Sequence, residues 1–405
     1  MRISGSLSLA VLTFACANHA PTSESPAPSA VEPDAPEQRA RPGEDGPASP
    51  APTKDVSRDL EAIRAKHGLV ALAGAAVNPS GAIAIGATGV RKQGDEARVT
   101  ADDRWHLGSD TKAMTATLAA ILVKEGKVSW DRTVVDAFPD FASRIDPAFR
   151  EVTLVELLTQ TAGLPPNLLE LNAVWSRLRA DAQPLAEQRV WLAEQVLTMH
   201  PLGKPGEFGY ANSNYIVAGA MLEAATGQTW EQLIRERLFV PLEMKSCGFG
   251  APGTPGTAGT SQPDEPWGHL GGDTASPVPP GPGADNPRAL GPAGTVHCSL
   301  RDWAKFIALH LRGAKQDTKL LQRSSFARLQ SPAPASGGYA YGWGTTERTW
   351  AGGKALYHSG SNTMFYATAW LAPEKSVAYL AVTNQMNAEA TDEVVAWLIE
   401  TFPAP

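Results

Sequence analysis

The sequence predicts an α+β fold, in which both chain ends build an antiparallel sheet with flanking helices and the middle inserts an all-helical domain. Apolar stretches of strand length occur at residues 69–90 and again at 365–384. Between them, motifs that open helices recur, and no repeat of 20–50 residues is apparent. The 405 residues suffice to bury a sizeable core.

The first part of the folded chain should form a helix and a β-hairpin. The helix is expected to end near Gly68, a residue type common just after helices. Two apolar runs lie at residues 69–77 and 82–90. Between them, residues 78–81 carry Pro and Gly at the positions that these residues prefer in a tight turn. Three residues would form the apolar face of the helix: Val56, Leu60 and Ile63.

The last part should form a second hairpin and a closing helix. Residues 365–371 and 377–384 are the expected strands, joined around 373–375. The closing helix would carry Val394, Trp397 and Leu398 on one face. Strands at both ends and helices in the centre therefore suggest one sheet, with a helical insert at about 130–312.

Three helices of the middle part open with capping motifs or close variants of them. Each pairs a hydroxyl residue with Glu, Gln or Asp three positions later: Thr153 and Glu156, Thr229 and Gln232, Ser299 and Asp302. The first should end near residues 163–165. The third should end at Gly313, with an inward face of four apolar residues: Trp303, Phe306, Ile307 and Leu311.

Charge and composition exclude several classes of function. The chain has 35 basic and 42 acidic residues, a net charge of −7, which argues against a nucleic-acid partner. Apolar residues make up 43% and charged residues 19%, values that suit neither a disordered nor a fibrous chain. The sequence has no CxxC or HExxH motif, so we expect no metal site, and we expect no cofactor.

The N-terminus predicts export. Residues 1–16 have the form of a signal peptide, with an apolar stretch too short to span a membrane. One alternative is cleavage by an ordinary signal peptidase at Ala15-Cys16-Ala17. The other, slightly favoured by the sequence, is lipidation of Cys16 as in a bacterial lipoprotein. Location in the periplasm or cell envelope follows, with membrane contact only through an anchor on Cys16. Residues 17–54 contain nine prolines and should be a disordered linker, which leaves 55–405 as the folded domain.

Two further features of the body leave alternatives open. Residues 251–292 hold ten prolines and nine glycines, and such a long loop is usually functional or disordered. Within it, residues 267–269 could be an ordered anchor or part of a solvated excursion. Cys247 and Cys298 are the only cysteines of the body. A disulfide between them is conceivable after export, but we expect two free buried thiols because the sequence shows no geometry.

The first element that could take part in catalysis is Ser109 with Lys112. They lie between a strand-like segment, 105–107, and an apolar helical stretch, 113–123, one turn apart on the same face. A serine needs a base to become a nucleophile, and burial can lower the pKa of a lysine until it serves as one. On spacing alone, a serine helix cap with a solvated lysine is the commoner explanation of such a motif.

Two more elements follow in chain order. Tyr210 and Asn212 lie in a turn before a helix, where a phenol can transfer a proton and an amide can orient a carbonyl or a lysine. The strand His358, Ser359, Gly360 and Ser361 could pair with an extended substrate, since glycine allows close approach. The Ser361 and Ser109 N–H groups could form an oxyanion hole. Taken singly, these are a helix cap and an ordinary strand end.

Together, the three elements resemble the penicillin-recognising serine hydrolases, whose signature includes S-x-x-K. The class C branch, which also includes D-alanyl-D-alanine carboxypeptidases, D-aminopeptidases and esterases, is the more similar. The resemblance, from about residue 58 to 401, implies a β-lactamase/transpeptidase-like fold with Ser109 as the acylated nucleophile. Lys112 and Tyr210 would share the base and acid roles, Asn212 would orient substrate and lysine, and 358–361 would bind substrate. Supporting segments lie at 156–165, 205–215, 223–227, 241–244 and 292–295.

Departures from the family pattern bear on substrate. Gln160, Ala162 and Glu243 replace the usual His, Ser and Gly without touching the chemistry, whereas His358 replaces a lysine that gives β-lactamases a constant positive charge. We therefore expect a peptidase or esterase acting on small acyl or D-amino-acyl substrates, peptidoglycan-derived ones included. Efficient β-lactam hydrolysis is the alternative, and a non-catalytic binding or sensor domain is the second. An α/β-hydrolase is disfavoured because G-x-S-x-G is absent.

Overall fold

The computed structural model describes residues 53–165, 172–254, 263–271 and 274–404 of the chain. The expected signal peptide and all but the last two residues of the expected linker lie outside these residues. Lys54, placed at the end of that linker by the sequence, already belongs to a short strand of the folded domain.

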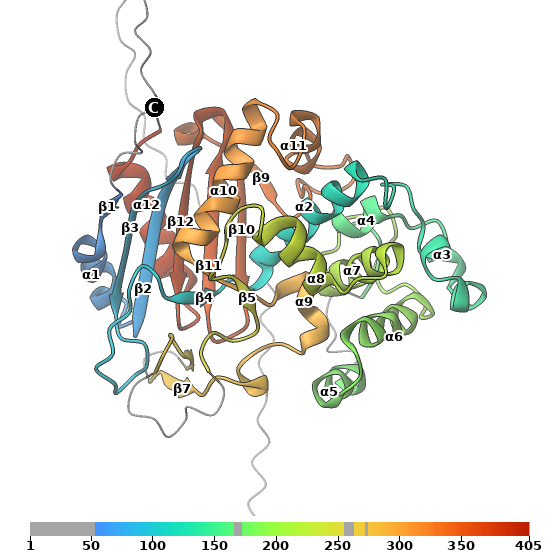
Figure 1. Ribbon diagram of the computed structural model, residues 1–405, viewed down its shortest axis with the longest axis horizontal. Coiled ribbons are helices and arrows are strands. Elements are labelled where there is room, and N and C mark those ends of the chain that lie inside the picture. Colours follow the sequence, from blue (N-terminus) through green and yellow to red (C-terminus); the bar gives the residue numbers. More distant parts are fainter. Residues whose placement is uncertain (1–52, 166–171, 255–262, 272–273, 405) are drawn as a thin grey trace, which may run out of the picture. The chain divides into compact units, whose positions relative to one another are not determined.

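A seven-stranded sheet organises the domain, with the order β1-β3-β2-β12-β11-β10-β9 (Figure 1). Its neighbours pair antiparallel except β1 with β3, and β12 pairs with β2, so strands from both chain ends meet in the middle. This confirms the predicted sheet and both hairpins. The strands are β1 (Lys54–Asp55), β2 (Ala71–Asn78), β3 (Gly81–Gly89), β9 (Gly344–Arg348), β10 (Gly353–Ser361), β11 (Tyr366–Ala372) and β12 (Val377–Thr383).

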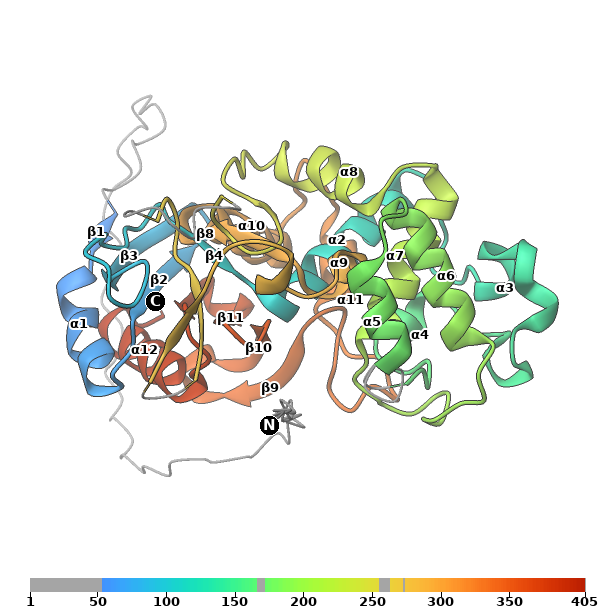
Figure 2. The same ribbon diagram turned by 90° about the horizontal axis from the view of Figure 1, so that it is seen from below.

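Terminal helices cover one face of this sheet. α1 (Ser57–Lys66) and α12 (Ala388–Thr401) lie next to each other (Figure 2). Their buried residues, among them Leu60 and Val394, form one apolar cluster with Leu72 of β2. Both helices were predicted, and the spacing of their apolar residues explains why they bury this face.

The opposite face carries α10 (Leu300–Lys315), and the buried residues of α2 (Thr111–Lys124) belong to the same apolar cluster. α10 packs against β2, β3 and β12, whereas the predicted insert of about 130–312 included it among its helices. The helix also continues past Gly313, where a stop was expected. A Cβ at Gly313 would lie 2.1 Å from the Phe326 ring, so the glycine allows the close packing of α11 (Arg323–Leu329) and does not cap the helix.

The remaining helices gather beside α2, away from the terminal helices (Figure 2). They are α3 (Val134–Ala137), α4 (Leu154–Leu158), α5 (Asn172–Ala180), α6 (Leu185–Leu197), α7 (Asn212–Thr226), α8 (Trp230–Ile234) and α9 (Gly291–Gly294). The capping motifs at Thr153 and Thr229 are confirmed, but α4 ends at Leu158, earlier than expected. Arg189 of α6 is fully buried and pairs with Glu223 and Glu231, which ties α6, α7 and α8 together.

Short turns connect these elements. They are η1 (Gly108–Asp110), η2 (Pro139–Arg144), η3 (Pro147–Phe149), η5 (Arg235–Phe239), η7 (Pro282–Ala284), η8 (Arg288–Leu290), η9 (Thr349–Ala351) and η10 (Pro373–Lys375). In the part of the chain that the structure describes, no helix is long and apolar enough to cross a membrane.

A second sheet has the order β4 (Arg104–His106), β8 (Val296–Ser299) and β5 (Gly248–Phe249). Its register places Gly248 opposite His297, so Cys247 and Cys298 become cross-strand neighbours. They form a disulfide, and the expectation of two free thiols is therefore wrong. The reason lies in the non-local pairing of β5 with β8, which no local sequence pattern reveals.

The described part of the long Pro- and Gly-rich segment contains ordered structure. β6 (Gly268–Leu270) pairs with β7 (Ser276–Val278), and Trp267 and His269 are buried. The His269 ring contacts the Asn384 carbonyl at 2.9 Å and accepts the Gln93 N–H at 3.0 Å. The ordered anchor is thus the correct alternative for residues 267–269.

Candidate active site

Ser109 lies in η1, where the small sheet passes into α2. The Leu107 N–H donates to the Val296 carbonyl, which ties this turn to β8. Gly108 has φ +51°, and a Cβ there would lie 2.3 Å from the Ser361 nitrogen. Only glycine lets the nucleophile turn approach β10 this closely.

His106 holds the same turn through a hydrogen bond to its backbone. Its Nδ1 accepts the Gly108 N–H at 3.1 Å, and its Nε2 lies 2.8 Å from a carboxylate oxygen of Asp285. The His106 ring is fully buried. Because the ring spans from Gly108 to the segment before α9, it links the position of the nucleophile to a distant part of the chain.

Lys112 lies one helical turn after Ser109 and is fully buried. Its Nζ is 3.0 Å from Ser109 Oγ, 2.8 Å from Asn212 Oδ1 and 2.7 Å from the Ala293 carbonyl. Burial lowers the pKa of Lys112 to about 7, and Asp110 opposes the shift. A neutral amine has two N–H donors and one lone pair. With the two donors directed at Asn212 and Ala293, the lone pair is left for the Ser109 hydroxyl.

The Ala293 carbonyl is held in place by contacts of α9 with α2 and α7. The Thr115 hydroxyl of α2 donates to the Pro292 carbonyl, and the Thr111 hydroxyl accepts the Val296 N–H. A Cβ at Gly219 of α7 would lie 2.3 Å from the Pro292 ring. The glycine therefore allows α9 to lie against α7 with the Ala293 carbonyl next to Lys112.

Tyr210 and Asn212 flank the start of α7, and Gln160 organises the turn that carries them. The side-chain oxygen of Gln160 accepts the Ala211 N–H at 3.0 Å and an Asn214 amide N–H at 2.5 Å. Its backbone carbonyl accepts the Gly209 N–H, and its φ is +63°. The sequence singled out Gln160 only as a departure from the family pattern. Its supporting role depends on contacts about 50 residues away, and no local signal points to them.

The Tyr210 hydroxyl hydrogen bonds with the Ser109 side chain. Burial raises its pKa well above the ordinary value, and the contact with Ser109 opposes this only partly. The phenol therefore keeps its proton at neutral pH. Tyr210 as a whole residue is 37% exposed, and Lys112 Nζ lies 4.9 Å from the ring centre. A protonated phenol and a lysine with a pKa near 7 thus flank one serine.

The strand β10 lies against the nucleophile turn. A Cβ at Gly360 would lie 2.0 Å from the Leu107 carbonyl oxygen and 2.4 Å from the Ser109 nitrogen. β9 pairs with β10 only as far as Tyr357, so no strand in the described part of the chain pairs with His358–Ser361 on that side. The backbone nitrogens of Ser109 and Ser361 thus lie in neighbouring segments, as an oxyanion hole requires.

His358 lies in the same strand but is buried and held by two contacts. Its Nδ1 lies 2.9 Å from the Ser359 carbonyl oxygen, and its Nε2 lies 3.2 Å from the Tyr339 hydroxyl. Burial, followed by the nearby charge of Lys112, lowers the pKa of His358 to about 3. The imidazole is therefore neutral at pH 7, with Nδ1 donating and Nε2 accepting. Tyr339 was absent from the sequence prediction because it lies in no recognised motif.

Asp110 follows the nucleophile and is also buried. Among the described residues neither of its carboxyl oxygens has a hydrogen-bond partner. Burial raises its pKa well above the ordinary value, although Lys112 opposes this. Asp110 in turn raises the pKa of Lys112, but burial outweighs this effect, so the lysine remains available as a base near pH 7.

The structure thus brings together seven of the eight predicted site residues around one point. The side chain of the eighth, Ser359, contacts Thr368 of β11 at 3.0 Å.

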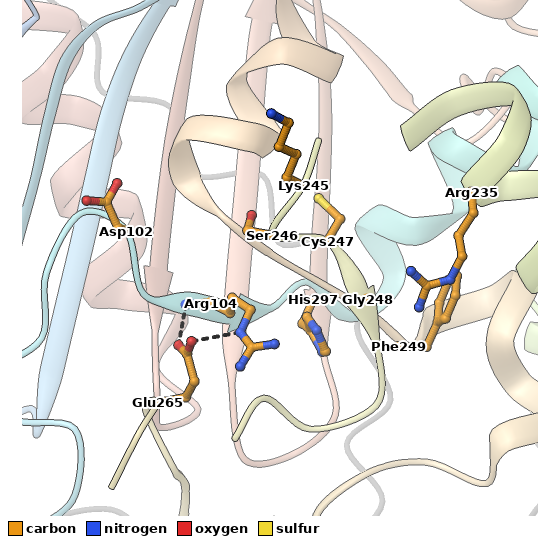
Figure 3. Close-up of a pocket in the computed structure, with 10 residues that line it drawn as sticks. All are labelled: Asp102, Arg104, Arg235, Lys245, Ser246, Cys247, Gly248, Phe249, Glu265 and His297. Carbon is orange, nitrogen blue, oxygen red and sulfur yellow. Dashed lines mark hydrogen bonds and ion pairs between the residues drawn. The ribbon is translucent and has the colours of Figure 1, made fainter. Parts of the chain in front are cut away.

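A pocket of about 500 Å³ lies elsewhere, next to the disulfide (Figure 3). Arg104 there pairs with Glu265, and the Arg235 guanidinium lies over the Phe249 ring. None of the residues lining this pocket belongs to the Ser109 cluster.

Comparisons with known proteins show which family and fold the chain resembles. The family model described as Beta-lactamase matches residues 56–401. Penicillin-binding protein 4 of Amycolatopsis lactamdurans is 26% identical over 339 residues, which cover 80% of this chain and 83% of that protein. Protein flp of Staphylococcus aureus (strain MW2) is 26% identical over 301 residues, 73% of this chain. The match covers 55% of Protein flp, so the chain spans about half its length.

Two solved structures share the fold. The octameric penicillin-binding protein homologue from Pyrococcus abyssi superposes with a TM-score of 0.67 at 22% identity, over 85% of this chain and 77% of that chain. A D-stereospecific amidohydrolase from Streptomyces sp. gives a TM-score of 0.64 at 19% identity, over 83% and 97%. These similarities confirm the predicted β-lactamase/transpeptidase-like fold.

Proposed function

We propose that this chain, which belongs to the β-lactamase family, hydrolyses small esters and amides through a covalent acyl-enzyme on Ser109. The family and its penicillin-binding relatives make it a serine β-lactamase or penicillin-binding-like hydrolase in the broad sense. The observation that carries the proposal is the buried Lys112 Nζ, 3.0 Å from Ser109 Oγ, with a pKa of about 7.

In the acylation step, neutral Lys112 accepts the proton of the Ser109 hydroxyl as Oγ attacks the carbonyl carbon. The N–H groups of Ser109 and Ser361 stabilise the oxyanion that develops. Tyr210 keeps its proton at neutral pH and donates it to the departing nitrogen or oxygen as the bond to the acyl carbon breaks. Transfer of a proton from the Lys112 ammonium to the Tyr210 phenolate restores both groups. In deacylation, water attacks the acyl carbon and gives its proton to neutral Lys112, the bond to Ser109 Oγ breaks, and Oγ takes that proton back from Lys112. Asn212 holds Lys112 in place throughout.

The charge state of His358 supports a peptidase or esterase over a β-lactamase. A β-lactam carries a carboxylate, and its recognition is strengthened by a nearby cation. At pH 7 the imidazole of His358 is neutral, since its pKa is about 3. The site therefore favours small acyl or D-amino-acyl substrates that do not depend on a charge at this position.

Labelling with a fluorescent fluorophosphonate tests the nucleophile. The wild-type protein should be labelled, and Ser109→Ala should not, while Ser331→Ala on the exposed surface serves as a matched control. Steady-state rates with p-nitrophenyl acetate, nitrocefin and a D-alanyl-D-alanine peptide then separate the classes. Labelling that persists in Ser109→Ala contradicts the nucleophile, and binding of penicillin without any turnover would identify a sensor domain. A kcat/KM for nitrocefin above roughly 10⁶ M⁻¹s⁻¹, high for enzymes in general, contradicts the substrate preference.

A further inference from the structure

Phe208, Tyr339 and Tyr210 form an aromatic wall at one side of the site. Phe208 is 45% exposed and lies two residues before Tyr210, which is 37% exposed. The Phe208 ring centre lies 5.9 Å from that of Tyr339, and Tyr210 meets Tyr339 edge-on at 6.0 Å. Large apolar side chains are seldom left exposed next to each other without a function.

The position of Phe208 is built into the fold. The backbone at Gly337 has φ +58° and packs against the ring, since a Cβ there would lie 3.4 Å from Phe208 Cβ and Cγ. Tyr339 is buried, and its hydroxyl contacts His358 Nε2. Phe208 is therefore supported from below while one side of its ring faces solvent.

Within the part of the chain that the structure describes, the three aromatic side chains of the wall bring no charge of their own to a ligand. His358 is neutral at pH 7, and Lys112 is committed to Ser109, Asn212 and Ala293. In the same loop as Phe208, Lys204 and Glu207 form an ion pair with each other. A carboxylate placed against this wall would lose its hydration without gaining an ionic partner.

The position of the proton donor indicates which part of the substrate contacts this wall. The departing oxygen or nitrogen must lie within hydrogen-bond reach of the group that protonates it. In the mechanism proposed above that group is Tyr210, whose ring is bordered by Tyr339 and His358. The substituent on the departing atom therefore lies beside Tyr210 and next to Tyr339, against which Phe208 packs.

We propose that Phe208, Tyr210 and Tyr339 form a subsite for an uncharged aromatic or apolar leaving group, so that the preferred substrates are esters or amides whose leaving group carries no carboxylate. This inference rests on the proposed acyl-enzyme function. In the reaction, Ser109 Oγ bonds to the acyl carbon, the bond from that carbon to the leaving oxygen or nitrogen breaks, and Tyr210 supplies the proton. The leaving group departs as a neutral phenol, alcohol or amine. Phe208 is here a specificity residue that contacts substrate and takes no part in proton transfer.

Three acetate esters test the subsite: methyl acetate, phenyl acetate and 3-carboxyphenyl acetate. The last two share the acyl group and a phenol leaving group and differ by one carboxylate. We expect kcat/KM to be at least about tenfold higher for phenyl acetate than for its carboxylated analogue. Contact between the phenyl ring of the substrate and Phe208 should contribute binding free energy that methyl acetate does not gain. Phe208→Ala should therefore lower the ratio of kcat/KM for phenyl acetate over methyl acetate about tenfold. Phe208→Leu should lower it less, and Val240→Ala, which removes an exposed apolar side chain elsewhere, should keep the wild-type ratio.

The two levels of the proposal fail differently. Hydrolysis that is equally fast in Ser109→Ala, or absent in the wild-type protein, overturns the acyl-enzyme function and the subsite with it. Hydrolysis that needs Ser109 but shows the same ester ratios in Phe208→Ala overturns the subsite alone. A preference for 3-carboxyphenyl acetate that needs Ser109 would likewise overturn it.

Discussion

Replacing Lys112 with methionine should change how stability depends on pH. In the unfolded chain this lysine keeps its proton up to its ordinary pKa of 10.5, whereas in the folded protein burial lowers the pKa to about 7. Between these two values, unfolding takes up a proton, so the free energy of unfolding rises with pH by about 1.4 kcal/mol per unit. Below pH 7 both states hold the proton and this slope disappears.

From pH 7 to pH 9 the wild-type protein should therefore gain about 2 to 3 kcal/mol relative to Lys112→Met. The methionine variant also loses the hydrogen bonds to Asn212 and Ala293, but that loss does not depend on the protonation of residue 112. The change in the difference between pH 7 and pH 9 thus isolates the titration. The stability difference between wild type and Lys112→Met at a single pH does not isolate the titration, because packing and hydrogen-bond effects also contribute to it.

Urea unfolding followed by tryptophan fluorescence at the two pH values measures this difference. The exposed Lys245→Met variant is the matched control and should follow the wild-type protein at both values. In the wild-type enzyme, kcat/KM for p-nitrophenyl acetate should fall about tenfold per pH unit below pH 7, because the same amine is the base. A difference between wild type and Lys112→Met that stays constant from pH 7 to pH 9 would refute the reasoning.

Other side chains give further predictions. His358→Lys places an ammonium where a neutral ring now lies, and the ratio of kcat/KM for nitrocefin over p-nitrophenyl acetate should rise about tenfold or more; an unchanged ratio contradicts the charge argument. Replacing Cys247 and Cys298 together with serine should lower the free energy of unfolding by about 2 to 4 kcal/mol in urea titrations. Equal stability of that variant and the oxidised wild-type protein would show that the cross-link contributes nothing. Arg189→Met leaves the buried Glu223 without its cation and should lower the free energy of unfolding by about 3 to 5 kcal/mol at pH 7. Because burial already raises the pKa of Glu223 above its ordinary value, the loss should be smaller at pH 5, and urea unfolding at both pH values measures it.

The elements that the sequence predicted correctly are those formed by neighbouring residues. The hairpin of β2 and β3 needs only two apolar runs and the turn at 78–81. The spacing of Ser109 and Lys112 is a property of a single helical turn, so their proximity could be expected before any tertiary contact was known. Gly313 shows the limit of such local arguments, because the same residue type ends one helix and lets another helix pack closely.

The family resemblance extended this local information across the chain. Ser109, Tyr210 and His358 are separated by roughly 100 residues or more, and nothing in their spacing indicates that they meet. Their motifs were informative as a set because one known fold brings such motifs together. Where the chain departs from that family, as at Gln160, the resemblance was silent about the role of the new residue.

Only the tertiary structure decided the properties that depend on burial and on contacts between distant residues. The pKa of Lys112 is set by complete burial and by Asp110, while the Ala293 carbonyl, 181 positions away, completes its hydrogen bonding. The neutral state of His358 depends on burial and on Lys112, with Tyr339 beside its ring. The sequence thus determined which groups could react and in what local order. Desolvation and long-range packing decided which of them carry a proton at neutral pH.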